Sequence, residues 1–367
     1  MLENLLRNSI KTLIPYTPKE YSNVIRLDAN ENNYGSRLLN QKLAKALMEV
    51  NINQYPDTDC TQLRGMLAKE LMVSEEELLV GCGSDQLIVM LLNAFIDKGD
   101  KIATLSPTFT MYKISNQIAG GETVEIPLKQ DFQFDYYAFI KGIKKENPKL
   151  VFITNPNNPT GGVIPREQII KIIEHSNAIV VVDEAYYEFY KESVIDLTSY
   201  YSNLVVLRTL SKAYGLAGAR IGYSVASKEL TGLIKRVKPP YNVSSLDQAA
   251  ARVCLDNKPL FEGIIEEILL QRERLAKELT KLEGLKVYES FGNFLLVRYQ
   301  KAMELYNYLL EKGIVVRYFG GGGALEGCLR ISIGTAEENT ILLEVLGDYW
   351  GIENQSTKLK QAVNSVI

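Results

Sequence analysis

The sequence predicts an α/β protein with a large domain built on a mainly parallel sheet of about six or seven strands, and a smaller α+β domain. Three observations predict this fold. The 367 residues exceed one typical domain, and 46% hydrophobic with 23% charged side chains is a globular composition. From about residue 75 to residue 225, short β-rich runs alternate with helical patterns. After residue 241 that alternation stops, and long helical patterns precede short strands.

The strands of the large domain are predicted from β-branched or leucine runs with little polar interruption, as in strands that helices cover on both faces. They lie at residues 77–80, 101–105, 150–154, 178–182, 204–207 and 221–225. Helical patterns between them, such as residues 85–95, supply the crossovers that parallel strands need.

The smaller domain is predicted from a change of pattern near Pro239 and Pro240. Helices are predicted at 245–255, 261–282 and 302–312, and strands at 286–288, 294–297, 314–317 and 329–333. We therefore divide the chain into an N-terminal arm (1–35), a large domain (36–240), a small domain (241–353) and a polar tail (354–367).

Composition excludes several classes of function. The 41 basic and 44 acidic side chains give a formal net charge of −3, which disfavours a nucleic-acid-binding surface. His175 is the only histidine, so a multi-histidine metal site is excluded, and we expect this residue to face solvent in the last turn of a helix. The four cysteines are scattered and form no C-x-x-C pair. With no secretory signal and no membrane-length apolar run, we expect a cytoplasmic protein.

The most specific motif surrounds Lys212, on a small-residue loop directly after the strand at 204–207. Ligands bind at the carboxyl ends of parallel strands, and a neutral lysine amine forms a Schiff base with a carbonyl. Thr209, Ser211 and Arg220 beside it are donors suited to a phosphate. The loop therefore predicts pyridoxal phosphate bound to Lys212, the alternative being an ordinary surface lysine.

Two neighbouring loops carry groups that fit the same cofactor. Asp183 follows the strand at 178–182, where its carboxylate can keep a pyridine nitrogen protonated; its alternative role is a helix N-cap. Asn158 lies in a turn-rich loop after the strand at 150–154 and can aim its amide at the cofactor's phenolic oxygen beside Tyr186. A plain turn is the alternative for Asn158.

A glycine-rich loop at residues 81–85 joins a predicted strand to a helix, which predicts an anion site at the helix N-terminus. A dinucleotide fingerprint is excluded because Gln86 stands where the third glycine is required. No phosphate-binding G-x-x-x-x-G-K-[ST] run occurs either.

Together these motifs resemble the fold-type-I, class I and II pyridoxal-phosphate-dependent aminotransferases, and within them the histidinol-phosphate aminotransferase family. That resemblance implies a large domain with a mainly parallel seven-stranded sheet plus a small α+β domain. The matching segments are residues 27–32, 55–57, 83–85, 107–109, 157–161, 183–186, 209–222, 239–243 and 328–332.

The resemblance implies a role for each matching residue. Lys212, Asp183 and Tyr186 would be catalytic, with Asp183 on the pyridine nitrogen and Tyr186 on the phenolic oxygen with Asn158. Cofactor binding would further involve Ser84, Asp85, Thr209, Ser211 and Arg220 at the phosphate, Phe109 on the ring face, and Tyr55 reaching the partner subunit's cofactor in a homodimer. Substrate binding would involve Tyr16, Asn30, Arg317 and Arg330.

The implied reaction transfers an amino group from a small-molecule donor, histidinol phosphate, to a 2-oxo acid, 2-oxoglutarate. Two departures from the family pattern are Asn33, where proline is usual, and the glycine run at 320–323. An aromatic-amino-acid transaminase and a decarboxylase similar to the threonine-phosphate enzyme stay open as alternatives. A pyridoxal-phosphate-binding regulator is disfavoured, because every catalytic position is filled and no DNA-binding segment is attached.

Overall fold

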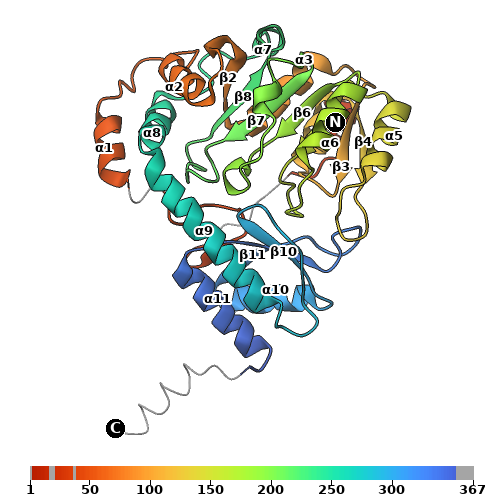
Figure 1. Ribbon diagram of the computed structural model, residues 1–367, viewed down its shortest axis with the longest axis vertical. Coiled ribbons are helices and arrows are strands. Elements are labelled where there is room, and N and C mark those ends of the chain that lie inside the picture. The colour runs from red at the N-terminus through yellow and green to blue at the C-terminus, as the bar shows by residue number, and fades with distance from the viewer. Residues whose placement is uncertain (1, 16–20, 36–38, 353–367) are drawn as a thin grey trace.

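The computed structural model describes residues 2–15, 21–35 and 39–352, which form two units, each built around one sheet (Figure 1). The larger sheet has seven strands in the order β2-β8-β7-β6-β5-β3-β4, and the smaller has five in the order β1-β11-β12-β10-β9. The predicted α/β fold with a mainly parallel seven-stranded sheet is therefore confirmed.

The strands of the large sheet run parallel except β8, which is antiparallel to both β2 and β7. Every residue of β5, β7 and β8 is buried, which matches their uninterrupted hydrophobic sequences. The bounds are β2 (Leu78–Cys82), β3 (Lys101–Ser106), β4 (Glu122–Pro127), β5 (Leu150–Thr154), β6 (Ile179–Asp183), β7 (Leu204–Thr209) and β8 (Ile221–Ala226).

Strand β4 is the one strand of this sheet that the sequence analysis missed. It lies at the edge and pairs only with β3, so most of its residues stay at least partly exposed. Its sequence includes Glu122, Glu125 and Pro127, which suit an edge strand and break the apolar run used to find the others.

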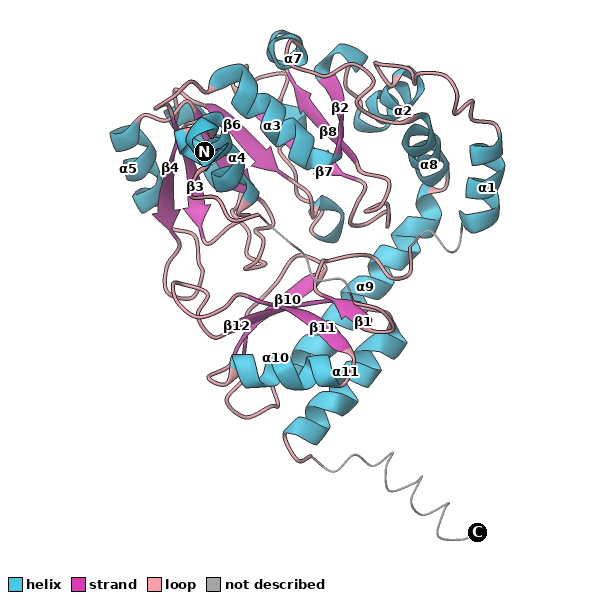
Figure 2. Ribbon diagram, turned by 180° about the vertical axis from the view of Figure 1, so that it is seen from behind, coloured by secondary structure: helices cyan, strands magenta, loops and turns pink. Residues whose placement is uncertain are grey.

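Helices cover both faces of the large sheet (Figure 2). Along β6, Val181 packs with α3, α4 and α7 on one face, whereas Val180 and Val182 pack with α5 and α6 on the other. The bounds are α3 (Gly83–Phe95), α4 (Met111–Ala119), α5 (Tyr136–Glu146), α6 (Arg166–His175) and α7 (Lys228–Lys235). At the β2 end of the sheet lie α1 (Asn40–Met48), α2 (Thr61–Leu71) and α8 (Ser245–Asp256).

The smaller unit packs helices on one face of its five-stranded sheet (Figure 2). The long helix α9 runs from the large unit down to the small one (Figure 1). The bounds are β1 (Ile25–Leu27), β9 (Lys286–Val287), β10 (Phe294–Arg298), β11 (Ile314–Tyr318), β12 (Cys328–Ser332), α9 (Lys258–Leu279), α10 (Ala302–Glu311) and α11 (Ala336–Tyr349). Strand β1 comes from the predicted N-terminal arm and pairs in parallel with β11. The residue numbers that divide the chain into arm, large domain, small domain and tail stay predictions.

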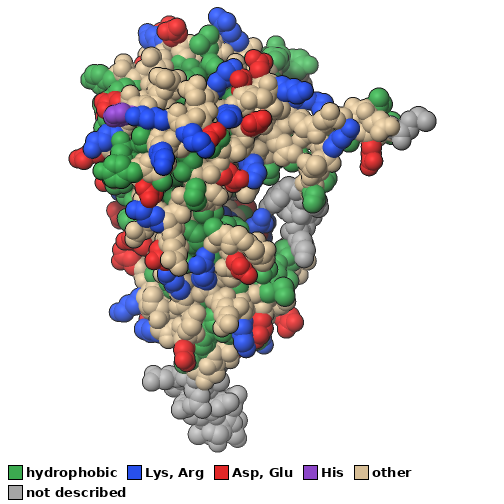
Figure 3. Space-filling view, turned by 90° about the vertical axis from the view of Figure 1, so that its right-hand side faces the viewer, with side chains coloured by type: hydrophobic (Ala, Val, Ile, Leu, Met, Phe, Trp, Pro, Cys, Tyr) green, Lys and Arg blue, Asp and Glu red, His purple; other side chains and the backbone are tan. Residues whose placement is uncertain are grey.

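His175 is the exposed last residue of α6, and its Nδ1 lies 2.7 Å from the carbonyl oxygen of Lys171. The expectation of a solvent-facing residue in the last helical turn is confirmed, and the side chain is visible on the surface (Figure 3). All four cysteines are free thiols. Within the residues described, no helix combines the length and apolar character that crossing a bilayer needs.

Candidate active site

The candidate site forms where neighbouring parallel strands of the large sheet end and face β12 of the small sheet. Asp183 is the last residue of β6, Asn158 follows β5, and Lys212 follows β7. Because β5, β6 and β7 are parallel and adjacent, their carboxyl ends lie at one edge. Arg330 of β12 donates from Nη1 to Oδ1 of Asn158 over 2.6 Å, which brings the small sheet to this edge.

The amine of Lys212 is held by the segment that follows β1. Its Nζ donates to the carbonyl oxygen of Ala29 over 2.8 Å. Asn32 donates from Nδ2 to the carbonyl of Ala213 over 2.7 Å and so holds the residue after the lysine. Burial, reinforced by the positive charge of Arg330, lowers the pKa of Lys212 from 10.5 to about 8. A considerable fraction of this amine is therefore neutral near physiological pH, as a nucleophile or base requires.

The carboxylate of Asp183 is buried and accepts two hydrogen bonds. Oδ2 accepts from the hydroxyl of Tyr112 at 2.7 Å, and Oδ1 accepts from the backbone N–H of Ala185 at 3.1 Å. Burial raises the pKa of Asp183 to about 6, and these hydrogen bonds act in the opposite direction. The helix N-cap alternative is not realised, because Tyr186 is the N-cap of the next helical element, a short 3-10 helix at Tyr187–Phe189.

Asn30 links the large and small sheets beside Asp183. Its Nδ2 donates to the hydroxyl of Tyr186 over 2.9 Å, and its Oδ1 accepts from Ser332 Oγ at 3.0 Å. The carbonyl of Asn30 also accepts from Asn293 Nδ2 at 3.0 Å. Burial raises the pKa of Tyr186, so its hydroxyl stays protonated and can donate to an oxygen in the site.

Two arginines lie side by side on neighbouring strands of the small sheet. Arg330 on β12 is directly opposite Arg317 on β11, so both side chains leave the same face. Arg330 is anchored by Nη2, which donates to the carbonyl of Asp28 over 2.6 Å, and its guanidinium lies over the ring of Phe294. Like charges in this arrangement favour an anion between them, which suits a carboxylate or phosphate.

The start of α3, the Lys212 loop and Arg220 form a cradle for an anion. A Cβ on Gly222 would collide with the backbone nitrogen of Ser84, and Gly83 has a positive φ of 74° against Arg220. The Nη2 of Arg220 donates to Oδ2 of Asp85 over 2.9 Å. Thr209 and Ser211 join this cluster, with their hydroxyl oxygens 3.0 Å apart. Backbone amides, hydroxyls and a guanidinium thus converge where the sequence predicts a phosphate.

Three other predicted residues are Phe109, Tyr55 and Tyr16. Phe109 packs edge-to-face on Tyr112, with ring centroids 5.5 Å apart, so it stands near Asp183. Tyr55 is 82% exposed and stacks on Tyr241, with no contact to Lys212 or Asp183 among its described interactions. Tyr16 lies outside the described residues.

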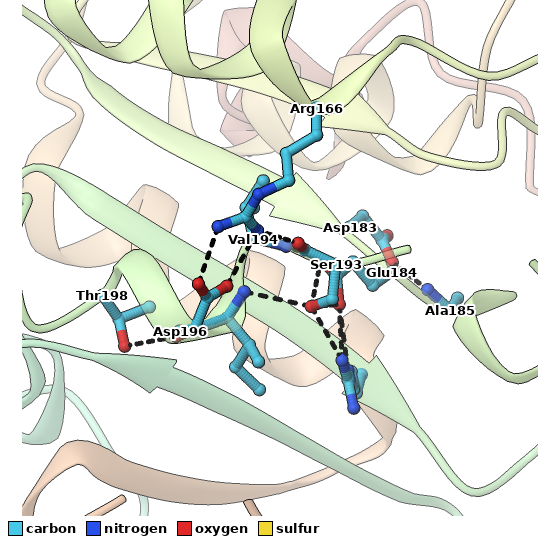
Figure 4. Close-up of polar contacts among 10 residues, drawn as sticks. Arg166, Asp183, Glu184, Ala185, Ser193, Val194, Asp196 and Thr198 are labelled. Atoms are coloured by element: carbon cyan, nitrogen blue, oxygen red, sulfur yellow. Dashed lines mark hydrogen bonds and ion pairs between the residues drawn. The ribbon is translucent and has the colours of Figure 1, made fainter. Parts of the chain in front are cut away.

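A buried ion pair behind the site escaped the sequence analysis. Glu184 and Arg208 are 2% and 5% exposed and meet through Nη2 and Oε2 at 2.9 Å. Glu184 also accepts from Ser193 Oγ and from the backbone N–H of Val194, and Arg166 binds Asp196 on the outer side of the same loop (Figure 4). Because Glu184 follows Asp183 and Arg208 precedes Thr209, the pair ties together the two strand ends that carry the site.

Comparison with known proteins identifies the family of the chain. The family described as aminotransferase class I and II matches residues 22–346. A histidinol-phosphate aminotransferase of Ruminiclostridium cellulolyticum is 44% identical over 351 residues, which are 94% of this chain and 98% of that relative.

Solved structures share the fold. The histidinol-phosphate aminotransferase of Sinorhizobium meliloti, in complex with pyridoxal-5'-phosphate, has a TM-score of 0.86 at 25% identity, over 94% of this chain and 97% of that one. The L-threonine-O-3-phosphate decarboxylase of Porphyromonas gingivalis has a TM-score of 0.77 at 27% identity, over 89% of this chain and 99% of that one.

Proposed function

The chain belongs to the family of class I and II aminotransferases, and on that premise we propose that it transfers the amino group of histidinol phosphate to 2-oxoglutarate. The products are imidazole acetol phosphate and glutamate, in a step of histidine biosynthesis. The observation that carries this proposal is Arg317 opposite Arg330 on neighbouring strands, because both substrates bring acidic groups. Identity of 44% to a histidinol-phosphate aminotransferase across nearly the whole chain supports it.

Pyridoxal phosphate is the cofactor of this enzyme, and the residues present fit it. The donor set combines a half-buried amine of lowered pKa, a buried carboxylate and an anion cradle around Ser84 and Arg220. When bound, pyridoxal phosphate supplies the electron sink that stabilises negative charge on the carbon bearing the substrate's amino group.

The residues that would hold the cofactor follow from their chemistry. Asp183 would keep the ring nitrogen protonated, and the Tyr186 hydroxyl and Asn158 amide would bind the phenolic oxygen. Ser84, Thr209, Ser211, Arg220 and the backbone N–H of Asp85 would hold the phosphate. The Asp85 side chain contributes indirectly, because its carboxylate pairs with Arg220.

Lys212 carries the proton transfer in this mechanism. Its Nζ would hold the cofactor and, when free, would act as the base that takes the proton from the carbon bearing the donor's amino group. A pKa of about 8 suits this task, because a base works best when its pKa is near the working pH. In the structure the carbonyl of Ala29 accepts a hydrogen bond from this amine, which places the amine at the edge of the sheet that carries the site.

The arginines divide the recognition of substrates. Arg330, fixed by Asn158 and Asp28, would bind the α-carboxylate of glutamate or 2-oxoglutarate with its planar fork. Arg317 would bind the phosphate of histidinol phosphate. Tyr16 stays a proposed helper.

We also propose a cytoplasmic homodimer in which Tyr55 reaches the partner subunit's cofactor phosphate. The side chain of Tyr55 is 82% exposed, and its ring is held in one orientation by stacking on Tyr241. An exposed but ordered ring of this kind supports a contact with a partner subunit. Met48 and Ile52, 87% and 78% exposed, lie just before it in the chain and would gain from burial. The four free thiols support a reducing compartment.

A threonine-phosphate decarboxylase is the second candidate, because the Porphyromonas gingivalis structure shares the fold at 27% identity. The same arginine pair would accept its phosphate and carboxylate. An aromatic-amino-acid transaminase is a third, in which Arg317 would have no phosphate to bind.

An amino-donor panel separates these functions. Histidinol phosphate, histidinol, phenylalanine and threonine phosphate are each supplied with 2-oxoglutarate, and glutamate and CO₂ are measured. We expect glutamate from histidinol phosphate, at least about tenfold less from histidinol, and no CO₂. Arg317→Ala should remove the preference for the phosphate, whereas Lys281→Ala, which removes a surface cation paired with Glu278, should not. Release of CO₂ from threonine phosphate as the main reaction would refute the proposal.

A further inference from the structure

Tyr112 on α4 is a buried tyrosine that contacts two candidate site residues at once. Its hydroxyl donates to Oδ2 of Asp183 over 2.7 Å. Its ring stacks on the ring of Phe152, with centroids 4.7 Å apart. It also forms a T-shaped contact with the ring of Phe109, with centroids 5.5 Å apart. The ring packing leaves the hydroxyl little freedom, so the hydrogen bond to Asp183 is fixed in direction as well as length.

The hydroxyl of Tyr112 is the first member of a hydrogen-bonded series. It lies 2.8 Å from Thr154 Oγ1, which lies 3.1 Å from Thr108 Oγ1. Thr108 in turn donates to Oδ1 of Asn157 over 2.6 Å. With Thr154 able to donate to its oxygen, Tyr112 directs its own single proton to Asp183.

The charged groups near Asp183 disfavour its ionised form, so a hydrogen-bond donor is needed to stabilise that form. Asp85 on α3 and the adjacent Glu184 oppose ionisation of Asp183 by their negative charge, as burial does. Tyr186 is also near, and its hydroxyl is bound to Asn30. Tyr112 supplies the only side-chain hydrogen bond to Asp183 among the described residues, beside the backbone N–H of Ala185.

We propose that Tyr112 is a positioning residue of this enzyme, which keeps the Asp183 carboxylate ionised and aimed at the ring nitrogen of pyridoxal phosphate. The inference rests on the proposed function. Without the hydroxyl, Asp183 loses a donor and takes up its own proton more readily, so it cannot hold a proton on the ring nitrogen. The burial of Tyr112 and the raised pKa of its hydroxyl keep that donor protonated.

The test is Tyr112→Phe, which removes only the hydroxyl. Dissociation constants are measured for pyridoxal phosphate and for its analogue with carbon in place of the ring nitrogen, which gives Asp183 nothing to bind. The wild-type enzyme should bind pyridoxal phosphate more tightly than this analogue. Because a hydrogen bond to a charged group contributes on the order of tenfold or more to an equilibrium, Tyr112→Phe should reduce that preference by about tenfold. The affinity for the analogue should change little.

Three further variants distinguish positioning from general stability. In an Asp183→Asn background, Tyr112→Phe should no longer change the preference, because the charge that it supports is gone. Tyr288→Phe is the matched control: it removes a buried hydroxyl with no hydrogen-bond partner among the described residues, and should leave the preference unchanged. Thr154→Val, which keeps Tyr112 but removes the neighbouring hydroxyl, should shift the preference in the same direction as Tyr112→Phe.

The outcomes separate this inference from the function on which it rests. If Tyr112→Phe lowers only the free energy of unfolding and leaves the cofactor preference intact, the inference is overturned while the function stands. An equal effect of Tyr112→Phe in the Asp183→Asn background would also overturn it. If the unchanged enzyme binds pyridoxal phosphate without the visible band of a cofactor joined to lysine, the proposed function itself fails, and the inference with it.

Discussion

Replacing Asp183 by asparagine should make the cofactor-free protein more stable while it abolishes activity. In the folded protein, burial raises the pKa of this carboxyl from 3.8 to about 6, so the folded state binds its proton more tightly than the unfolded state does. Stability from this group is therefore fully present below about pH 4 and is lost as the pH rises through about 6. A difference of roughly two pKa units corresponds to about 3 kcal/mol at neutral pH. Asparagine, which carries no charge, escapes that penalty.

Urea unfolding of the cofactor-free protein measures this effect. At pH 7.5, Asp183→Asn should raise the free energy of unfolding by about 3 kcal/mol, and at pH 4 the two proteins should differ little. Asp196→Asn is a suitable control, because Asp196 is exposed and its ion pair with Arg166 lies on the outer side of the same region. Equal stability at pH 7.5, or a difference that does not fall toward pH 4, would refute the conclusion that the buried charge of Asp183 destabilises the folded protein.

Four further perturbations follow from the site. Lys212→Ala should remove the visible cofactor band and lower turnover by at least about 100-fold; retention of both would contradict its role. In the cofactor-free protein, the rate of Lys212 acylation, followed by peptide mass, should rise with a midpoint near pH 8 rather than near 10.5. Arg330→Lys should raise KM for glutamate about tenfold or more with little loss of folding, since lysine lacks the planar fork. Glu184→Gln removes the carboxylate that pairs directly with the buried Arg208 and leaves Glu188 as its remaining acidic neighbour, so it should lower the free energy of unfolding by about 3 kcal/mol. Asp196→Asn should change it by less than about 1 kcal/mol.

Much of the fold and of the cofactor site could be predicted from the sequence. Apolar runs mark the strands, and parallel strands bring the polar loops that follow them to one edge of the sheet. The runs that became β5, β6 and β7 are apolar throughout, since both faces are covered, and each is followed by a polar loop. Parallel strands place those loops at one edge of the sheet, so the sequence alone predicts that Asn158, Asp183 and Lys212 lie together.

The parts that could not be predicted depend on contacts between distant segments. Tyr112 donates to a carboxylate 71 residues away and is one of 21 tyrosines, so nothing local distinguishes it. Glu184 and Arg208 each continue an apolar strand, and their pairing depends on the register of β6 against β7. Strand β1 has only three residues, too few for any periodicity. Asn33, which departs from the family's proline, gains a role through a hydrogen bond to Glu338 of α11.

The proposed reaction exchanges an amino group between histidinol phosphate and 2-oxoglutarate with the help of Lys212 and the cofactor. Single-turnover absorption spectroscopy of the purified enzyme with pyridoxal phosphate follows this exchange at the cofactor itself. Adding histidinol phosphate without any acceptor should abolish the visible band in one turnover, and adding 2-oxoglutarate should restore it with one glutamate formed per site. A band that persists with histidinol phosphate, while phenylalanine bleaches it or threonine phosphate releases CO₂ without bleaching it, would rule out this exchange.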